Sequence, residues 1–215
     1  MAAMDKQPAR RFGLIVIGDE ILSGRRSDKH LSKMIELLNE RGLSLSWARY
    51  LSDDPDQIVQ CLKETFASGD VVFSTGGIGA TPDDHTRACT AKALGLELAL
   101  HPEAKDLISQ RIIETAEGDP IKADLTSPGS LQRFRMGEFP IGSQTIPNTY
   151  NLIPGYSIQE HYFLPGFPVM AERMMAVLSD ATDEHGIEFF QPNSGSQGIV
   201  HVVGPELGLT QPGIT

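Results

Sequence analysis

Short apolar segments alternate with segments of helical periodicity over the first third of this chain. Residues 12–17, 43–51 and 70–74 form the apolar segments, and the two stretches between them carry apolar residues every three or four positions. When helices separate consecutive strands in this way, the strands pair in parallel through right-handed crossovers. The order therefore predicts an α/β fold built on a parallel sheet.

The pattern continues less regularly beyond the third apolar segment. Three more helices and a late strand are predicted: helices from about residue 84 to 94, from residue 102 onward and over 168–178, and a strand that ends at residue 164. Residues 118–162 are rich in Gly and Pro and give no readable pattern. We expect one α/β domain over residues 12–180, followed by a carboxyl-terminal extension of uncertain structure over residues 181–215.

The composition limits the classes of function. The chain has 215 residues, enough for one sizeable core, and its formal net charge is −10. Such an acidic surface repels nucleic acids and anionic membranes, so we expect neither as a main partner, and a small phosphorylated ligand must be held locally. Cys61 and Cys89 have no second pair nearby, so neither a disulfide framework nor a zinc site is expected. Because no apolar stretch of about 18 residues and no signal peptide is present, the cytoplasm is the expected compartment.

Two clusters of glycine and carboxylate residues follow predicted strands. Residues 18–24 read Gly-Asp-Glu-Ile-Leu-Ser-Gly and follow the first strand. Residues 74–86 read Ser-Thr-Gly-Gly-Ile-Gly-Ala-Thr-Pro-Asp-Asp-His-Thr and follow the third. Ligands of open parallel sheets bind outside the carboxyl ends of the strands. We therefore expect both clusters to face one ligand site.

The glycine run at residues 76–79 can be interpreted as an anion site. Successive peptide N–H groups without side chains can approach a phosphate closely, and a positive φ angle costs little at glycine. On this basis, Gly77→Val is expected to remove ligand binding while leaving a folded protein. A glycine turn after a strand is also often only a tight loop, and neither a Rossmann nor a Walker fingerprint is present.

Four carboxylates accompany the two clusters: Asp19, Glu20, Asp83 and Asp84. Asp84 alone could be the cap of the helix that follows it, but four carboxylates are more than capping needs. Mg²⁺, or another divalent cation that bridges carboxylates and substrate phosphates, would neutralise the surplus charge. The sequence therefore predicts a cation site, with helix capping as the alternative for Asp84.

At these same residues the sequence resembles the molybdopterin-binding domain of molybdenum cofactor biosynthesis proteins and of the amino-terminal half of competence/damage-inducible protein A. The resemblance rests on residues 18–24 and 75–86, on Pro-Asn at 147–148 and on Leu-Pro-Gly-Phe-Pro at 164–168, and it covers residues 12–178. The chain is most similar to short bacterial members of the competence/damage-inducible branch. The resemblance implies a three-layer α/β/α sandwich with a mostly parallel sheet, a homo-oligomer (dimer or trimer), and a site for molybdopterin or a nucleotide.

The resemblance also implies roles for individual residues. Catalytic roles fall to Asp19, Asp83, Asp84 and Thr86, and the metal ligands are Asp19, Glu20, Asp83 and Asp84. The residues implied in ligand or phosphate binding are Gly18, Ser23, Gly24, Thr75, Gly76, Gly77, Gly79, Thr81, Asn148, Pro165 and Gly166.

Several functions stay open at this point. The biosynthetic branch adenylylates molybdopterin with Mg-ATP, whereas the competence-protein branch is associated with metal-dependent cleavage of ADP-ribose. The third function is that of a non-catalytic module that carries a ligand to a partner, and the intact carboxylate set favours chemistry over it. A purely structural role would make both clusters a coincidence. The amidohydrolase domain of full-length competence proteins has no counterpart before Thr215, so we expect no deamidation of nicotinamide mononucleotide.

Overall fold

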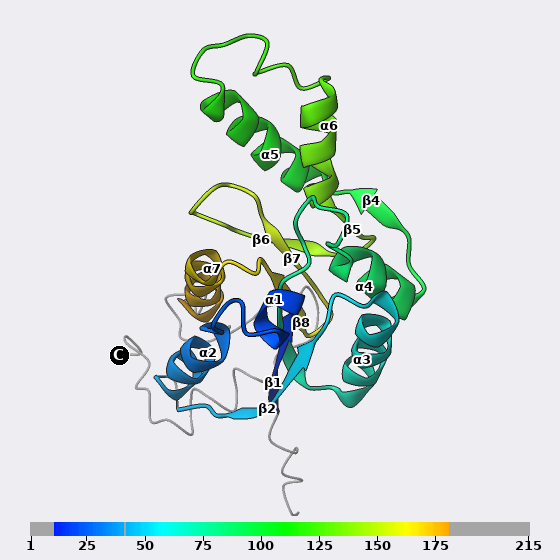
Figure 1. Ribbon diagram of the computed structural model, residues 1–215, viewed down its shortest axis with the longest axis vertical. Helices are drawn as coiled ribbons and strands as arrows, with labels where there is room; N and C mark the ends of the chain where they lie inside the picture. Colours follow the sequence, from blue (N-terminus) through cyan, green and yellow to red (C-terminus); the bar gives the residue numbers. More distant parts are fainter. Residues whose placement is uncertain (1–10, 41, 181–215) are drawn as a thin grey trace, which may run out of the picture.

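The computed structural model describes residues 11–40 and 42–180, and Figure 1 shows a central sheet with helices on both sides. Six strands lie in the order β2-β1-β3-β8-β7-β6. In chain order they are β1 (Phe12–Ile17), β2 (Leu45–Leu51), β3 (Val71–Thr75), β6 (Gln144–Ile146), β7 (Gly155–Ile158) and β8 (His161–Leu164). The pairs β1–β2, β1–β3 and β3–β8 are parallel, and β7 and β6 extend the sheet by antiparallel pairing. The predicted mostly parallel sheet is confirmed.

Two helices cover each face of this sheet (Figure 1). On one face, α2 (His30–Asn39) packs against α7 (Pro168–Asp180). On the other face, α3 (Pro55–Ser68) packs against α4 (Thr86–Leu94). The three-layer α/β/α sandwich implied by the family resemblance is therefore confirmed.

The sheet buries apolar side chains on both faces. In β1, Leu14 and Val16 belong to the core that contains residues of α2 and α7, while Ile15 and Ile17 belong to the core on the side of α3 and α4. A strand buried on both faces needs apolar residues at every position. This burial explains why β1 is an unbroken apolar run in the sequence.

A smaller lobe projects from the sandwich and has a core of its own (Figure 1). Two helices, one 3₁₀ turn and an antiparallel strand pair build it: β4 (Leu98–Leu100), α5 (Pro102–Thr115), α6 (Pro128–Phe134), η1 (Arg135–Gly137) and β5 (Glu138–Pro140). Ile108, Ile112 and Phe134 form its buried cluster. Of these elements only α5 was predicted, as the helix starting at Pro102. The elements α6, η1 and β5 lie in the stretch over residues 118–162 that has no readable pattern.

Local signals place several element boundaries correctly. Asp54 caps α3, because its side chain accepts hydrogen bonds from the amides of the second and third residues after it at 2.9 and 3.3 Å. Gly69 ends the same helix with a φ of 72°. Some boundaries differ from the prediction: β2 begins at Leu45 rather than residue 43, and a short helix, α1 (Asp19–Leu22), stands where a loop was expected. Four residues are too few to show a helical period.

The predicted extension over residues 181–215 lies outside the described residues. Within residues 11–40 and 42–180, no helix is both long and apolar enough to cross a membrane.

His161, at the start of β8, is a buried histidine with an unusual protonation equilibrium. Its Nε2 atom lies 2.9 Å from Thr65 Oγ1, and its ring lies against Phe66 with the centroids 3.8 Å apart. Burial lowers the pKa of the imidazole from 6.5 to about 3. The unfolded chain therefore takes up a proton below about pH 6.5 that the folded chain does not take up until about pH 3.

We expect the free energy of unfolding to fall as the pH drops from about 6.5 towards 3, with His161 contributing up to about 5 kcal/mol of the loss. His161→Phe should be less stable than the wild type near neutral pH, because the contact with Thr65 is lost, but it should lose less stability on acidification. Urea unfolding of both proteins at about pH 7.5 and about pH 4.5 measures the difference. Parallel pH dependence in the two proteins would contradict this account of His161.

Candidate functional site

The carboxyl ends of β1, β2, β3 and β8 meet at one edge of the sheet, because these four strands are parallel. Both predicted clusters lie at this edge, since one follows β1 and the other follows its neighbour β3. The two are packed together: a Cβ atom on Gly76 would collide with the carbonyl oxygen of Ile17. The structure thus brings the two clusters into one place, and glycine at position 76 makes the contact possible.

The glycine loop, residues 76–81, has all of its carbonyl groups bonded within the protein. Thr86 of α4 donates to the first two carbonyls, through its hydroxyl at 2.9 Å and its amide at 3.0 Å. The guanidinium of Arg87 donates to the next two carbonyls. The last two accept from Gln132 Nε2 at 2.7 Å and from the amide of Asp84 at 3.1 Å. These bonds fix the loop and leave its carbonyl groups unavailable to a ligand.

The amide groups of the glycine loop, unlike its carbonyl groups, are mostly without hydrogen-bond partners in the described part of the chain. Among the described residues, nothing accepts a hydrogen bond from the N–H groups of residues 77–80. The flanking amides are bonded, from Gly76 to the Leu164 carbonyl at 3.0 Å and from Thr81 to Asp84 Oδ2 at 2.8 Å. Consecutive N–H donors without a partner form a backbone site for an anion. The predicted glycine run therefore has the donors that a phosphate requires.

Arg87 is a residue of the site that sequence reasoning missed. Its side chain is 8% exposed and lies under the glycine loop, where burial lowers the pKa of the guanidinium. The group still stays charged at neutral pH, since an isolated arginine loses its proton only above about pH 12. Arg87 thereby places a positive charge behind the row of amides. The contact of Arg87 with the glycine loop could not be predicted, because the sequence does not indicate which face of α4 packs against the loop.

Asp53, just after β2, is a second missed residue. Its Oδ2 accepts from the amide of Asp19 at 2.9 Å, and its own amide donates to Asp19 Oδ1 at 3.3 Å. Burial raises the pKa of the Asp53 carboxyl, and the negative charges of Asp19, Glu20 and Asp83 raise it further. The ends of three neighbouring strands therefore contribute to one negatively charged carboxylate cluster. The consecutive aspartates at 53–54 were a signal, but only the second was interpreted, as a helix cap.

The carboxylate cluster matches a divalent cation in charge and in donor type. Burial and, to a smaller extent, the neighbouring carboxylates raise the pKa of Asp53. A bound Mg²⁺ would relieve the repulsion between these carboxylates, and carboxylate oxygens are its preferred protein ligands. Among the described residues, however, no three His, Cys, Asp or Glu side chains are gathered closely enough to hold a metal ion as they stand. Binding would therefore need the side chains to move or a ligand to supply further oxygens.

Asp84 and Thr86 have roles within the loop. Asp84 Oδ2 accepts from the amide and hydroxyl of Thr81, at 2.8 and 2.5 Å. It does not cap α4, which begins two residues later than predicted, with His85 at the N-cap position and no side-chain cap. Thr86 is fully buried and donates its hydroxyl to the glycine loop. Both side chains hold the loop in the structure, and the catalytic roles that the resemblance implies for them stay predictions.

The remaining predicted residues lie in three places around the glycine loop. Gly18, Ser23 and Gly24 flank α1, where the Ser23 hydroxyl donates to the Asp19 carbonyl at 2.6 Å. Thr75 ends β3, with its hydroxyl 3.5 Å from the Ile15 carbonyl. Pro165 follows β8, and a Cβ on Gly166 would lie 3.2 Å from the Cα of Gly76.

Asn148 is buried, and its side chain forms hydrogen bonds within its own loop. Its Nδ2 donates to Asn151 Oδ1 at 2.8 Å and to the Ile153 carbonyl at 2.9 Å, and its Oδ1 accepts from the Tyr150 amide at 3.0 Å. The side chain predicted to bind a ligand therefore organises residues 148–153.

Comparison with known proteins decides the family. The family described as "Probable molybdopterin binding domain" matches residues 13–184, well over half of the chain. The chain belongs to this family. The resemblance seen in the sequence motifs is thereby confirmed, and the family match contains both the glycine loop and the carboxylate cluster.

Relatives with the same domain are mostly longer than this chain. A CinA-like protein of Citrifermentans bemidjiense is 32% identical over 169 residues, which are 77% of this chain and 38% of that protein. A protein of Caldivirga maquilingensis is 31% identical over 175 residues, 80% of this chain and 63% of its own length. The solved structure of the protein CinA from Thermoplasma acidophilum covers 80% of this chain with a TM-score of 0.67 at 24% identity, which supports the fold.

Proposed function

We propose that this chain binds molybdopterin or a related phosphorylated nucleotide at the glycine loop and supports phosphate chemistry there with a divalent cation. The observation that carries the proposal is the row of amide groups at residues 77–80, which have no acceptor among the described residues. Four successive N–H groups without an acceptor in the protein are free to donate to a bound ligand. A phosphate group has enough oxygen atoms to accept from several of them at once.

The carboxylate cluster supports the second half of the proposal. A phosphate and a carboxylate cluster repel each other, and a cation held between them, such as Mg²⁺, would neutralise both. Asp19 and Asp53 are linked through each other's amides, so they offer carboxylate oxygens from two adjacent strand ends. Asp83 is exposed beside them and has no ion-pair partner within the described part of the chain. These side chains are the ones we assign to the cation.

Two reactions fit such a site. In nucleotidyl transfer, a substrate phosphate attacks the α-phosphate of ATP; in cleavage of ADP-ribose, water attacks the pyrophosphate. Both reactions develop negative charge on non-bridging oxygens, which backbone amides and a cation stabilise. The side chains around the loop do not favour one of the two, so the choice of substrate decides between them.

A thermal-shift screen tests the proposal. We expect the melting temperature to rise when the protein is mixed with Mg²⁺ or Co²⁺ and one of molybdopterin, ATP, ADP-ribose or FAD. A ligand at about 100 times its Kd adds about 2.7 kcal/mol to stability, which raises the melting temperature of a chain of this size by roughly 5–10 °C. The same screen without cation separates binding by the amides alone from cation-dependent binding. No shift with any phosphorylated ligand would contradict the proposal.

Self-association is a prediction that the resemblance supports. Light scattering on the purified chain, coupled to size-exclusion chromatography, distinguishes a monomer from the expected dimer or trimer.

A further inference from the structure

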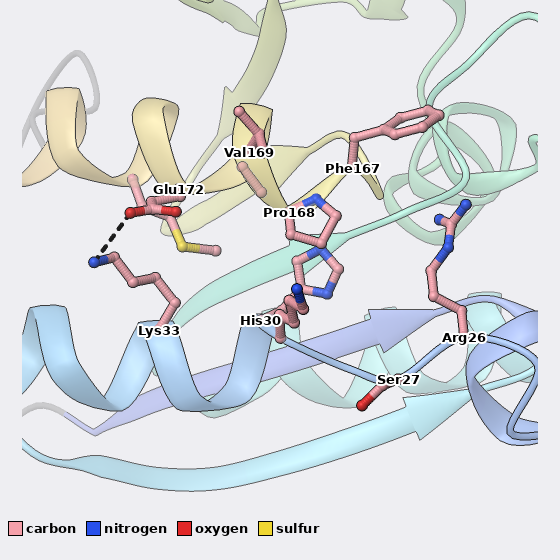
Figure 2. A pocket seen from close by; sticks show the side chains of 11 residues that line it. Arg26, Ser27, His30, Lys33, Phe167, Pro168, Val169 and Glu172 are labelled. Carbon is pink, nitrogen blue, oxygen red and sulfur yellow. Dashed lines mark ion pairs between the residues drawn. The ribbon is translucent and has the colours of Figure 1, made fainter.

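A cavity of about 450 Å³ lies between the first turns of α2 and α7 (Figure 2). We call it the α2–α7 pocket. Phe167, just before α7, and Val169 and Met175 of α7 line one side with apolar groups. Arg26 and Lys29, in the segment that precedes α2, make the other side basic. Cavities of this size and composition are typical of sites for small organic ligands. Nothing in the proposed function accounts for it so far.

The pocket adjoins the glycine loop directly. Gly166 packs on Gly76 of the loop, and the next residue, Phe167, lines the pocket. On the other side, Arg26 lies 3.4 Å from Glu20 of the carboxylate cluster. The segment at Gly166 and Phe167 therefore contacts the glycine loop at one residue and lines the pocket at the next.

The side chains of the pocket favour a flat ring with a negatively charged substituent. Phe167 and Val169 are 57% and 53% exposed, so two large apolar side chains face solvent beside an anion site. The Arg26 guanidinium lies 5.4 Å from the centre of the Phe167 ring, an arrangement that stacks planar groups readily. Lys33 is already paired with Glu172 at 3.1 Å, whereas Lys29 has no carboxylate partner among the described residues.

His30 provides an independent sign of a missing ligand. Its side chain lines the pocket, is 3% exposed, and holds Asp28 Oδ1 through Nδ1 at 2.9 Å. Its Nε2 atom is buried and without a hydrogen-bond partner in the described structure. A buried polar atom without a partner is unfavourable. A heteroaromatic ring carries polar edge groups that can reach such an atom when the ring enters between the two helices.

We infer that the α2–α7 pocket receives the planar heteroaromatic ring, a purine or a pterin, of a ligand whose phosphate groups lie on the glycine loop. The inference rests on the proposed function, because it takes the phosphate position from it. The ring lies against Phe167 and Val169, and Arg26 and Lys29 meet the charged part of the ligand where it leaves the pocket. The pocket, rather than the loop, then distinguishes one phosphorylated compound from another.

Calorimetric titration with pairs of probes tests the inference. Pyrophosphate and ADP differ by the adenosine, and tripolyphosphate and dihydroneopterin triphosphate differ by the pterin. With Mg²⁺ present, we expect the wild type to bind at least one ring-bearing probe about tenfold or more tightly than its ring-free partner. The pair that shows the gain identifies the ring as purine or pterin.

Val169→Glu provides the matching variant. Position 169 is exposed in the first turn of α7, where a carboxylate suits the helix N-terminus, so the variant should fold. It should abolish the gain from the ring and leave binding of pyrophosphate within about threefold of the wild type. Ile113→Glu, equally exposed on α5, is the control and should keep the gain.

Two results would overturn the inference in distinguishable ways. Failure of the wild type to bind pyrophosphate would overturn the anion site of the proposed function, and this inference with it. Binding of pyrophosphate with no gain from either ring, or a gain that Val169→Glu retains, would overturn the pocket assignment alone.

Discussion

Replacing Asp53 by Asn is expected to lower cation-dependent turnover by at least about 100-fold, without loss of stability in the cation-free protein. The carboxylate lies beside three others and adds to the negative potential that attracts a cation. Because its pKa is raised on folding, its ionised form destabilises the folded state at neutral pH, and the charge-free Asn removes this penalty. Asn also keeps an oxygen that can accept from the Asp19 amide. Turnover and stability should therefore move in different directions.

Turnover of ADP-ribose, or of molybdopterin plus ATP, across a Mg²⁺ titration measures the first effect, and melting curves without cation measure the second. Asp19→Asn and Asp83→Asn should lose turnover in the same way. Asp54→Asn is the matched control: it removes the same charge one residue along, where Asn caps a helix about as well as Asp. Full turnover in all three cluster variants would reject the cation site and favour a non-catalytic binding module.

Gly77→Val is expected to abolish ligand binding and to destabilise the protein by about 4 kcal/mol or more. Position 77 has a φ of 67°, and a Cβ there would collide with the Thr86 hydroxyl that holds the glycine loop. The sequence alone predicts a folded protein for this variant, because it gives no reason to place Thr86 against the glycine. The structure corrects that expectation: the loop and the start of α4 should be disturbed together.

Gly95→Val provides the control for backbone strain alone. Gly95 ends α4 with a φ of 68°, and a Cβ there would meet nothing within 4 Å. This variant should lose about 2 kcal/mol and bind ligand as the wild type does. Urea unfolding and calorimetric titration of the two variants separate the contributions. Equal loss of stability in both, with ligand binding intact in Gly77→Val, would show that the contact with Thr86 has no consequence.

The sequence was most informative where each element is specified by its own residues. β1 is buried on both faces and is therefore apolar at every position, and α3 carries its cap at Asp54 and its terminator at Gly69. The lobe around α5 and α6 was only partly predicted. Strand β5 of the lobe has three residues, so no alternation can be recognised, and its position depends on β4, which is distant in sequence. Strand β6 of the central sheet is equally short.

The location of the site could be predicted from the sequence, but the contacts between its side chains could not. The glycine and carboxylate clusters were identified because they follow strands that end at one edge of the sheet. Arg87 and Asp53 were missed because their roles depend on tertiary contacts, with the loop in one case and with Asp19 in the other. The burial of Thr86 under the loop is likewise not visible in the motif, and its implied catalytic role stays a prediction.

The central claim is that the amides of residues 77–80 bind a phosphate. Two-dimensional ¹H–¹⁵N NMR of the labelled protein, titrated with pyrophosphate in the presence of Mg²⁺, observes these groups directly. The account predicts that the amide signals of Gly77, Ile78, Gly79 and Ala80 move together, more than those of other residues, and saturate with a common Kd. It also predicts that the hydrogen-bonded amides in the interior of α3 stay unchanged. Saturable shifts elsewhere in the protein, with these four signals unmoved, would contradict the account.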